Sequence, residues 1–185
     1  TVNTILKKFD ISQTFYSAKL KNEINGSASH PEGGFTASNM DSNSYRKGLE
    51  TRINYNINRY SDASISYDYV DSTQYNSSTE NQQAEVRRPR NLININYNNN
   101  FFNNLSINSN IFYSSKVKDT DFSSYPYQNV YMSSYFLFNT TLNYDIDSKN
   151  KVSLIFKNIF NREYNIVNDF NTPGFEVLIN YRNNF

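Results

Sequence analysis

The sequence predicts an all-β fold, an antiparallel transmembrane β-barrel segment of about eight strands. The end of the chain is the first indication: Phe175, Val177, Ile179 and Tyr181 alternate with mostly polar residues, and Phe185 is the last residue. Successive strand side chains point to opposite faces, so this alternation separates an apolar face from a polar one. Strands of this kind suit a barrel with lipid outside and a polar lumen inside.

The composition is the second indication. The 185 residues have a mean hydropathy of −0.73, and no stretch approaches the roughly 18 consecutive apolar residues of a membrane helix. Barrel strands place their apolar residues at alternate positions, so this does not exclude a membrane. Tyr (16) and Phe (14) are abundant whereas Gly (5) and Pro (4) are scarce, which favours long strands.

Eight segments alternate as strands do. They are 8–24, 44–58, 62–71, 90–99, 104–115, 131–145, 150–160 and 174–185. The first segment is the least regular, because Phe9, Ile11 and Phe15 have one parity and Ala18, Leu20 and Ile24 the other. We predict a β-bulge near Tyr16, since one extra residue would bring both sets to one face.

In each of segments two to seven, the apolar residues lie at alternate positions, and we call this set of positions the apolar parity. Its members are Leu49, Thr51, Ile53, Tyr55 and Ile57; Ala63, Ile65, Tyr67 and Tyr69; Ile93, Ile95 and Tyr97; Leu105, Ile107, Ile111 and Tyr113; Phe136, Phe138, Thr140, Leu142 and Tyr144; and Val152, Leu154, Phe156 and Phe160. Phe112 is out of pattern. The middle of this parity carries no charge, as expected where a lipid-facing Lys or Arg costs about 2–4 kcal/mol. A soluble barrel with its apolar face inward would alternate in the same way.

The connections are the third indication. Long ones (25–43, 72–89, 116–130 and 161–173) alternate with short ones (59–61, 100–103 and 146–149). Outer-membrane barrels have short periplasmic turns and long extracellular loops. We therefore expect the long connections outside and the C-terminus on the periplasmic side. Aromatic residues gather near the strand ends, as in interfacial girdles; they are Tyr60, Tyr97, Phe101, Phe102, Tyr144 and Phe185 at one rim and Tyr45, Tyr69, Tyr113, Phe136 and Phe175 at the other.

The most specific motif is Lys157-Asn-Ile-Phe-Asn-Arg-Glu-Tyr164, followed by Asn171-Thr-Pro-Gly-Phe-Glu176 and the closing strand. It resembles the C-terminus of TonB-dependent outer-membrane receptors, and within that superfamily it is most similar to the cobalamin (vitamin B12) receptors. The matching positions are Asn158, Phe160, Tyr164, Pro173, Gly174 and Phe185, and the segments 47–50 and 87–90 also look similar. Phe175, where Arg is usual, and Asn183, where an apolar residue is usual, weaken assignment to one substrate.

The resemblance implies that residues 1–185 are the C-terminal portion of a 22-stranded barrel with a plug, and that the plug and the TonB-contacting segment are absent from this chain. It implies a receptor in the bacterial outer membrane that imports a scarce nutrient, either cobalamin-like or a ferric siderophore. The energy for import would come from the TonB complex. The implied partners are membrane lipid, lipopolysaccharide, the remaining barrel and plug, TonB and a small-molecule substrate. We expect an isolated open sheet with 9–24 and 175–185 as its edges. Alternatives are a self-contained eight-stranded outer-membrane barrel with a structural or adhesive role, and a soluble carrier.

Enzyme chemistry is not indicated. Cysteine is absent, His30 is the only histidine, and no phosphate-binding loop or nucleophile elbow is present. We expect no cofactor. Net charge +1 gives no electrostatic case for nucleic acid. The pairs Asp119/Asp121 and Asp145/Asp147 suit either Ca²⁺ or solvated turns.

Binding residues are expected in two places. The polar parity carries candidate lumen-facing charges, which would contact the plug or substrate, or pair with one another; they are Glu50, Arg52, Asp68, Lys157, Glu176 and Arg182. Tyr125 and Tyr127 in the loop 122–127 would contact a large substrate or pack within the loop. Arg87, Arg88 and Arg90 would bind lipopolysaccharide phosphates or cap the following strand.

Overall fold

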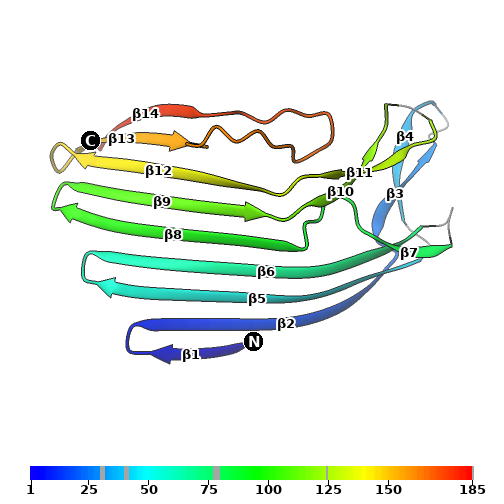
Figure 1. Ribbon diagram of the computed structural model, residues 1–185, viewed down its shortest axis with the longest axis horizontal. Coiled ribbons are helices and arrows are strands. Elements are labelled where there is room, and N and C mark those ends of the chain that lie inside the picture. The colour runs from blue at the N-terminus through cyan, green and yellow to red at the C-terminus, as the bar shows by residue number, and fades with distance from the viewer. Residues whose placement is uncertain (30–31, 40–41, 77–79, 124, 185) are drawn as a thin grey trace.

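A computed structural model describes residues 1–29, 32–39, 42–76, 80–123 and 125–184. The chain forms one long antiparallel sheet, and shorter strands project from one end of it (Figure 1). The strand order is β1-β2-β5-β6-β8-β9-β12-β13-β14, with β7 paired to the far end of β6. Within the described ranges no helix is long and apolar enough to cross a bilayer.

The strands of this sheet are β1 (Val2–Leu6), β2 (Phe9–Lys21), β5 (Asn43–Asn58), β6 (Ser61–Asn76), β7 (Asn81–Ala84), β8 (Asn91–Phe102), β9 (Leu105–Ser114), β12 (Tyr135–Asp145), β13 (Asn150–Lys157) and β14 (Glu176–Asn183). Two separate hairpins are β3 (Ile24–Ser29) with β4 (Phe35–Asn39) and β10 (Val117–Asp121) with β11 (Gln128–Met132). The prediction of an all-β antiparallel open sheet is confirmed, with more strands than the eight expected.

Register explains how the alternation within each strand becomes two continuous faces. Directly paired residues lie on the same face, and one row of pairs crosses six strands from β2 to β12. Its members are Ile11, Ile53, Ile65, Ile95, Ile111 and Phe138. A slip of one residue in any strand would turn its apolar side chains to the other face.

The apolar face is not covered by other parts of the described chain. Met132 is the only buried hydrophobic residue in the described ranges, whereas Ile65, Ile111 and Ile179 are 42%, 40% and 74% exposed. A soluble sheet would bury such residues by packing this face against a second layer.

Two pairs of polar side chains on the apolar face bond each other. The Tyr67 hydroxyl donates to Asn91 Oδ1 at 2.8 Å on the neighbouring strand. The Ser109 and Thr140 hydroxyls lie 2.9 Å apart and share a hydrogen bond. Such internal satisfaction is what a surface without access to water requires.

The polar face carries a chain of amide hydrogen bonds across five strands. Asn98 donates to Asp62, Asn108 to Asn98 and Asn143 to Asn108, each at 2.8 Å, and Ser153 donates to Asn143 at 2.7 Å. The abundant Asn residues of these strands therefore form hydrogen bonds between strands on this face.

The first strand differs from the prediction. β2 pairs with β5 without a register shift from Phe9 to Lys21, so the predicted bulge near Tyr16 was wrong. Tyr16 instead lies opposite Gly48, and a Cβ atom on Gly48 would come within 2.3 Å of the Tyr16 ring. The glycine makes room for the ring on the polar face, and Ala18 and Leu20 share that face.

The N-terminal edge was also predicted wrongly. β1 pairs with β2, so the sheet ends at β1 rather than at residues 9–24, while the other edge is β14, as expected. β1 and β14 are the two ends of the strand order, so the described strands do not close on themselves. The predicted segment 8–24 joined two elements, because Ile24 begins the separate hairpin strand β3.

Short turns and long connections lie at opposite ends of the sheet (Figure 1). The turns after β1, β5, β8 and β12 share one end with the C-terminus, and the predicted long connections share the other. Those long connections are partly strand: 25–43 contains most of the β3–β4 hairpin, 72–89 contains β7, and 116–130 contains most of the β10–β11 hairpin. We call this second end the loop-bearing end.

The two faces predict opposite chemical accessibility. Single Cys substitutions at Ile53, Ile95 and Leu142 should react with a lipid-soluble maleimide in outer-membrane vesicles, because these side chains lie on the apolar face. Cys at the neighbouring Asn54, Asn96 and Asn143 should react with a charged, water-soluble maleimide. Mass spectrometry of the labelled protein measures both, and the reverse pattern would show that the apolar face is turned inward.

Candidate functional site

A buried carboxylate, Glu85, joins strands and loops at the loop-bearing end. It follows β7 and accepts hydrogen bonds from Arg46 Nη2 at 2.8 Å and from the Ser72 hydroxyl. It also forms an ion pair with Arg88 Nε at 2.6 Å. Arg46 also pairs with Glu23. Burial raises the pKa of Glu85, but the hydrogen bonds from Arg46 and Ser72 and the charges of Arg88 and Arg46 outweigh it, so the pKa is lowered.

A second carboxylate, Asp119, joins three connections. Its side chain is fully buried and accepts hydrogen bonds from Arg87 Nε and from the backbone N–H groups of Thr120 and Asn168, each at 2.8 Å. Burial raises its pKa, but these donors outweigh burial, so the pKa is lowered. The backbone of Arg87 adds a 2.7 Å hydrogen bond to the Lys118 carbonyl. The 85–90 connection, the β10–β11 hairpin and the loop before β14 therefore meet at Asp119.

These contacts place the arginines that the sequence pointed to. Arg87 and Arg88 each bond a buried carboxylate on the chain itself, and Arg90 pairs with Asp71 at 2.8 Å. Sequence reasoning did not single out Glu85, because no chemical motif includes it. Its partner Arg46 is far from it along the chain, and β5–β6 pairing brings the two together.

The aspartate pairs considered for Ca²⁺ serve turns. Asp121 accepts from the Ser123 N–H at 2.8 Å, and Asp147 accepts from the N–H groups of Lys149 and Asn150 at 2.8 and 2.9 Å. Asp119 is occupied as described above. No group of three or more potential metal-ligating His, Cys, Asp or Glu residues occurs in the ranges that the structure describes.

The C-terminal motif is a set of turn-forming amides. Asn158 is buried with φ 47°, exchanges two hydrogen bonds with the backbone of Arg162 and donates to the Pro173 carbonyl at 3.3 Å. Asn161 has φ 48° and accepts from the Phe175 N–H at 2.9 Å. A Cβ on Gly174 would come within 2.5 Å of Asn161 Oδ1, so a side chain there would displace the oxygen that bonds the Phe175 N–H. The motif therefore closes the loop that leads into β14.

The aromatic motif residues anchor this loop to both faces of β12. Phe160 packs on Phe136 and Phe138, with ring centroids 5.8 Å apart, on the apolar face. The ring centroids of Tyr164 and Tyr135 are 4.4 Å apart, and Tyr135 lies on the polar face of β12.

A pocket of about 670 Å³ opens beside the Tyr135–Tyr164 pair. Its wall includes Arg162, Glu163, Asn168 and Asp169 from the loop before β14, together with residues of β11 and of its link to β12. It thus offers aromatic faces, amides and charges of both signs to a polar ligand. The sequence singled out Tyr164 as part of a family motif and not as a pocket residue.

The predicted aromatic loop is the tip of the β10–β11 hairpin. Tyr125 is 88% exposed, and the rings of Phe122 and Tyr125 contact the Tyr127 ring edge-on, with centroids 5.0 and 5.7 Å away. The rings therefore pack within the loop and also present exposed surface, and contact with a substrate stays a prediction.

The charges predicted to face a lumen lie on the polar face. Glu50 and Asp68 are directly paired in register, so two carboxylates oppose each other there. Lys157 and Glu176 form an ion pair at 4.0 Å, and Arg182 donates to Asn184 at 3.1 Å. His30 and Phe185 lie outside the described residues.

No family model and no curated protein matches the sequence. Solved structures do match its fold. The siderophore receptor PirA from Acinetobacter baumannii has a TM-score of 0.76 at 14% identity, over 99% of this chain and 30% of that one. The FrpB iron transporter from Neisseria meningitidis has a TM-score of 0.74 at 15% identity, over 97% and 29%. The ferripyoverdine receptor of the Pseudomonas aeruginosa outer membrane has a TM-score of 0.73 at 13% identity, over 96% and 25%.

Asp119 predicts acid sensitivity of the loop-bearing end. Because the folded-state pKa is lowered, the stabilisation is complete above the ordinary value of 3.8 and is lost as the pH falls through the lowered value. We expect Asp119→Asn to reduce hydrogen-exchange protection of the Thr120 and Asn168 amides at pH 7. In the unmodified protein the same loss should appear only below pH 3.8. Glu163→Gln, at an exposed position in the same loop, is the control, and equal loss in both variants would contradict the assignment.

The structural likeness shows the fold of this chain. The chain spans about a quarter to a third of the length of the receptors it matches. It has the antiparallel sheet found in part of each of these three proteins.

Proposed function

We propose that this chain is part of the barrel of a TonB-dependent outer-membrane receptor that imports a scarce nutrient. The observation that carries the proposal is the uncovered apolar face, on which Tyr67 bonds Asn91 and Ser109 bonds Thr140. A face that meets lipid must satisfy its polar groups internally. The polar face, with its amide chain and charges, would then line the lumen, and the remaining barrel and a plug would complete the receptor.

A ferric siderophore or another metal complex is the substrate class that the structural neighbours support, because their names state siderophore, iron and copper. The resemblance of the C-terminal motif to cobalamin receptors stays a narrower prediction. The pocket beside Tyr135 and Tyr164 and the tip around Tyr125 and Tyr127 are the surfaces that we assign to substrate contact.

The self-contained eight-stranded barrel is the less favoured function. A free-standing barrel has no unpaired edge, whereas β1 and β14 remain at opposite ends of this sheet. In the proposed receptor, β1 and β14 would each pair with a strand from the rest of the barrel.

Membrane topology gives a direct test. We expect epitope tags inserted in 25–43, 72–89 and 116–130 to bind antibody on intact cells, because the loop-bearing end would be extracellular. A tag at Ser61, in a short turn, should bind only after the outer membrane is permeabilised. Flow cytometry measures both, and surface binding at Ser61 would invert the topology.

Uptake by a strain that lacks the gene tests the function itself. The strain is grown under iron limitation on a panel of ferric siderophores, and its cobalamin-dependent growth is measured in parallel. We expect growth on one of these substrates to be lost and to be restored by the intact gene. Deletion of tonB should abolish the restored uptake. Unchanged growth on every substrate would contradict the receptor proposal, and loss on cobalamin alone would identify the narrower prediction as correct.

A further inference from the structure

We propose that Glu163 and Asp169 determine which metal complexes enter the pocket beside Tyr135 and Tyr164. Their carboxylates exclude strongly anionic complexes, so the pocket selects an uncharged complex such as a ferric tris-hydroxamate. The inference deepens the proposed function and rests on it in one respect, because it takes this pocket to be a surface that contacts the substrate.

Negative charge is in excess among the residues that line this pocket. The charged lining residues are Arg162, Glu163 and Asp169. Within the ranges that the structure describes, no ion pair joins any of the three to another side chain. Their charges therefore act on a ligand in the pocket and are not neutralised by a partner in the chain.

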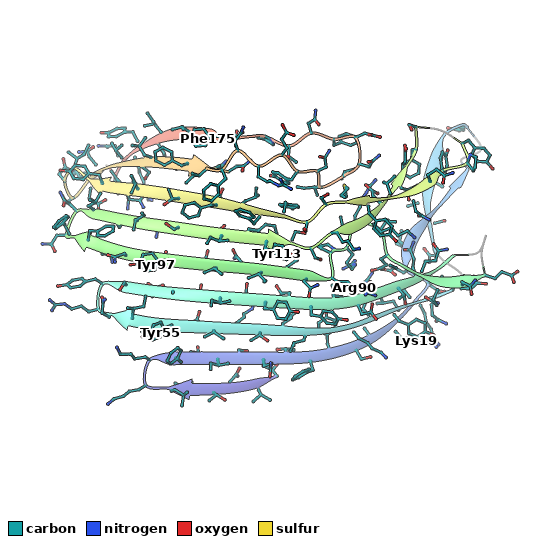
Figure 2. All side chains as sticks on the ribbon, in the orientation of Figure 1. Lys19, Tyr55, Arg90, Tyr97, Tyr113 and Phe175 are labelled. Atoms are coloured by element: carbon teal, nitrogen blue, oxygen red, sulfur yellow. The ribbon has the colours of Figure 1, made fainter. Side chains whose placement is uncertain are left out.

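Other cations at the loop-bearing end do not form a cluster for an anion. Arg87 is held by the buried Asp119, and Arg90, which Figure 2 shows toward this end of the sheet, pairs with an aspartate of β6 at 2.8 Å. The Lys116 ammonium lies 5.7 Å from the centroid of the Tyr131 ring, which lines the pocket. One lysine and one arginine thus accompany two carboxylates, which leaves no net positive charge.

Hydrogen bonds hold the loop that carries both carboxylates. The backbone of Arg162 exchanges two hydrogen bonds with the Asn158 side chain, and the Asn168 N–H donates to Asp119. The Asn168 amide also donates to Asp169 Oδ2 at 2.8 Å, which orients that carboxylate. The loop is therefore tied at two points along its backbone, and these bonds oppose its movement away from an anionic ligand.

The uncharged part of the pocket suits a ligand without net charge. The rings of Tyr135 and Tyr164, with centroids 4.4 Å apart, form part of its wall, and aromatic faces bind apolar surface. The side-chain amides of Asn165, Asn168 and Asn171 add neutral donors and acceptors. The volume of about 670 Å³ lies within the range of roughly 300–1,000 Å³ that small-molecule sites have.

The charge of the iron complex identifies the favoured ligand. A ferric ion with three hydroxamate groups, each of which carries a single negative charge, is uncharged, whereas three doubly charged catecholate groups give a trianion. A trianion loses hydration when it enters a pocket and requires compensating positive charge there. It also displaces the water that screens Glu163 and Asp169, so the repulsion increases. The uncharged complex meets neither cost.

The test measures binding of two ferric complexes to the full-length receptor purified in a neutral detergent. The probes are ferrichrome, an uncharged tris-hydroxamate complex, and ferric enterobactin, a trianionic tris-catecholate complex. We expect the unmodified receptor to bind ferrichrome at least about tenfold more tightly. Glu163→Gln/Asp169→Asn should raise the affinity for ferric enterobactin at least about tenfold and change that for ferrichrome less than about twofold.

The double variant preserves the loop. Asp169 has φ 64°, a backbone conformation that Asn also adopts, and an Asn side chain can accept the same hydrogen bond from Asn168. The matched control is Glu80→Gln/Asp121→Asn, which removes two carboxylates at the loop-bearing end outside the pocket lining. This control, and Glu163→Asp, which keeps the charge, should leave the preference unchanged.

Salt dependence gives a readout that a merely structural role would not change. Added salt should lower the affinity of Glu163→Gln/Asp169→Asn for ferric enterobactin, because it screens the attraction to the remaining cations. The affinity of the unmodified receptor for the same complex should not fall, because its pocket has no net positive charge to screen.

Several results would overturn the selection: equal or tighter binding of ferric enterobactin by the unmodified receptor, no gain in the double variant, an equal gain in the control, or no binding of either complex. Growth on the same complexes is measured separately. Growth on ferric enterobactin would overturn the selection and leave the proposed receptor function standing. Absence of growth on every substrate of the panel, cobalamin included, would count against the proposed function itself.

Discussion

Backbone pairing in an unbroken register is the constraint on which the other features depend. From β2 to β14 the main ladders shift only between Asn56 and Asn58 and between Asn100 and Phe102, next to short turns. Everywhere else the pairing continues without a shift, so the apolar residues of one strand lie on the same face as those of its neighbour. The row of pairs from Ile11 to Phe138 lies on the apolar face and the amide chain lies on the polar face, and both follow from the same register.

The chemistry of the two faces then differs for a physical reason. On the polar face, Asn side chains both donate and accept, which lets a chain of hydrogen bonds cross five strands from Asp62 to Ser153. On the apolar face, Tyr67 bonds Asn91 and Ser109 bonds Thr140, so these polar groups satisfy one another. The first arrangement is compatible with water and the second does not require it.

The loop-bearing end is organised by buried charge, and Met132 is the only buried hydrophobic residue among the residues that the structure describes. Glu85 and Asp119 each gather donors from elements that are distant along the chain. Burial of a carboxylate is costly unless it is fully hydrogen-bonded, so these contacts define where the connections lie relative to the sheet. The pocket beside Tyr164 and the hairpin tip at Tyr125 are positioned by that arrangement.

Alternation in the strands and the spacing of long and short connections sufficed to predict the all-β antiparallel sheet, the two faces of the strand segments from Leu49 onward, and which connections share an end. These features follow from local periodicity, which the sequence carries directly. The Tyr16 bulge was wrong because the sequence does not reveal that the ring has room opposite Gly48. The Glu85 and Asp119 clusters could not be predicted, since their partners are distant along the chain and are brought close only by strand pairing. The sequence by itself thus determined the two faces, and the tertiary structure decided the edges and the loop contacts, because hydrogen bonds between distant segments leave no periodic signal.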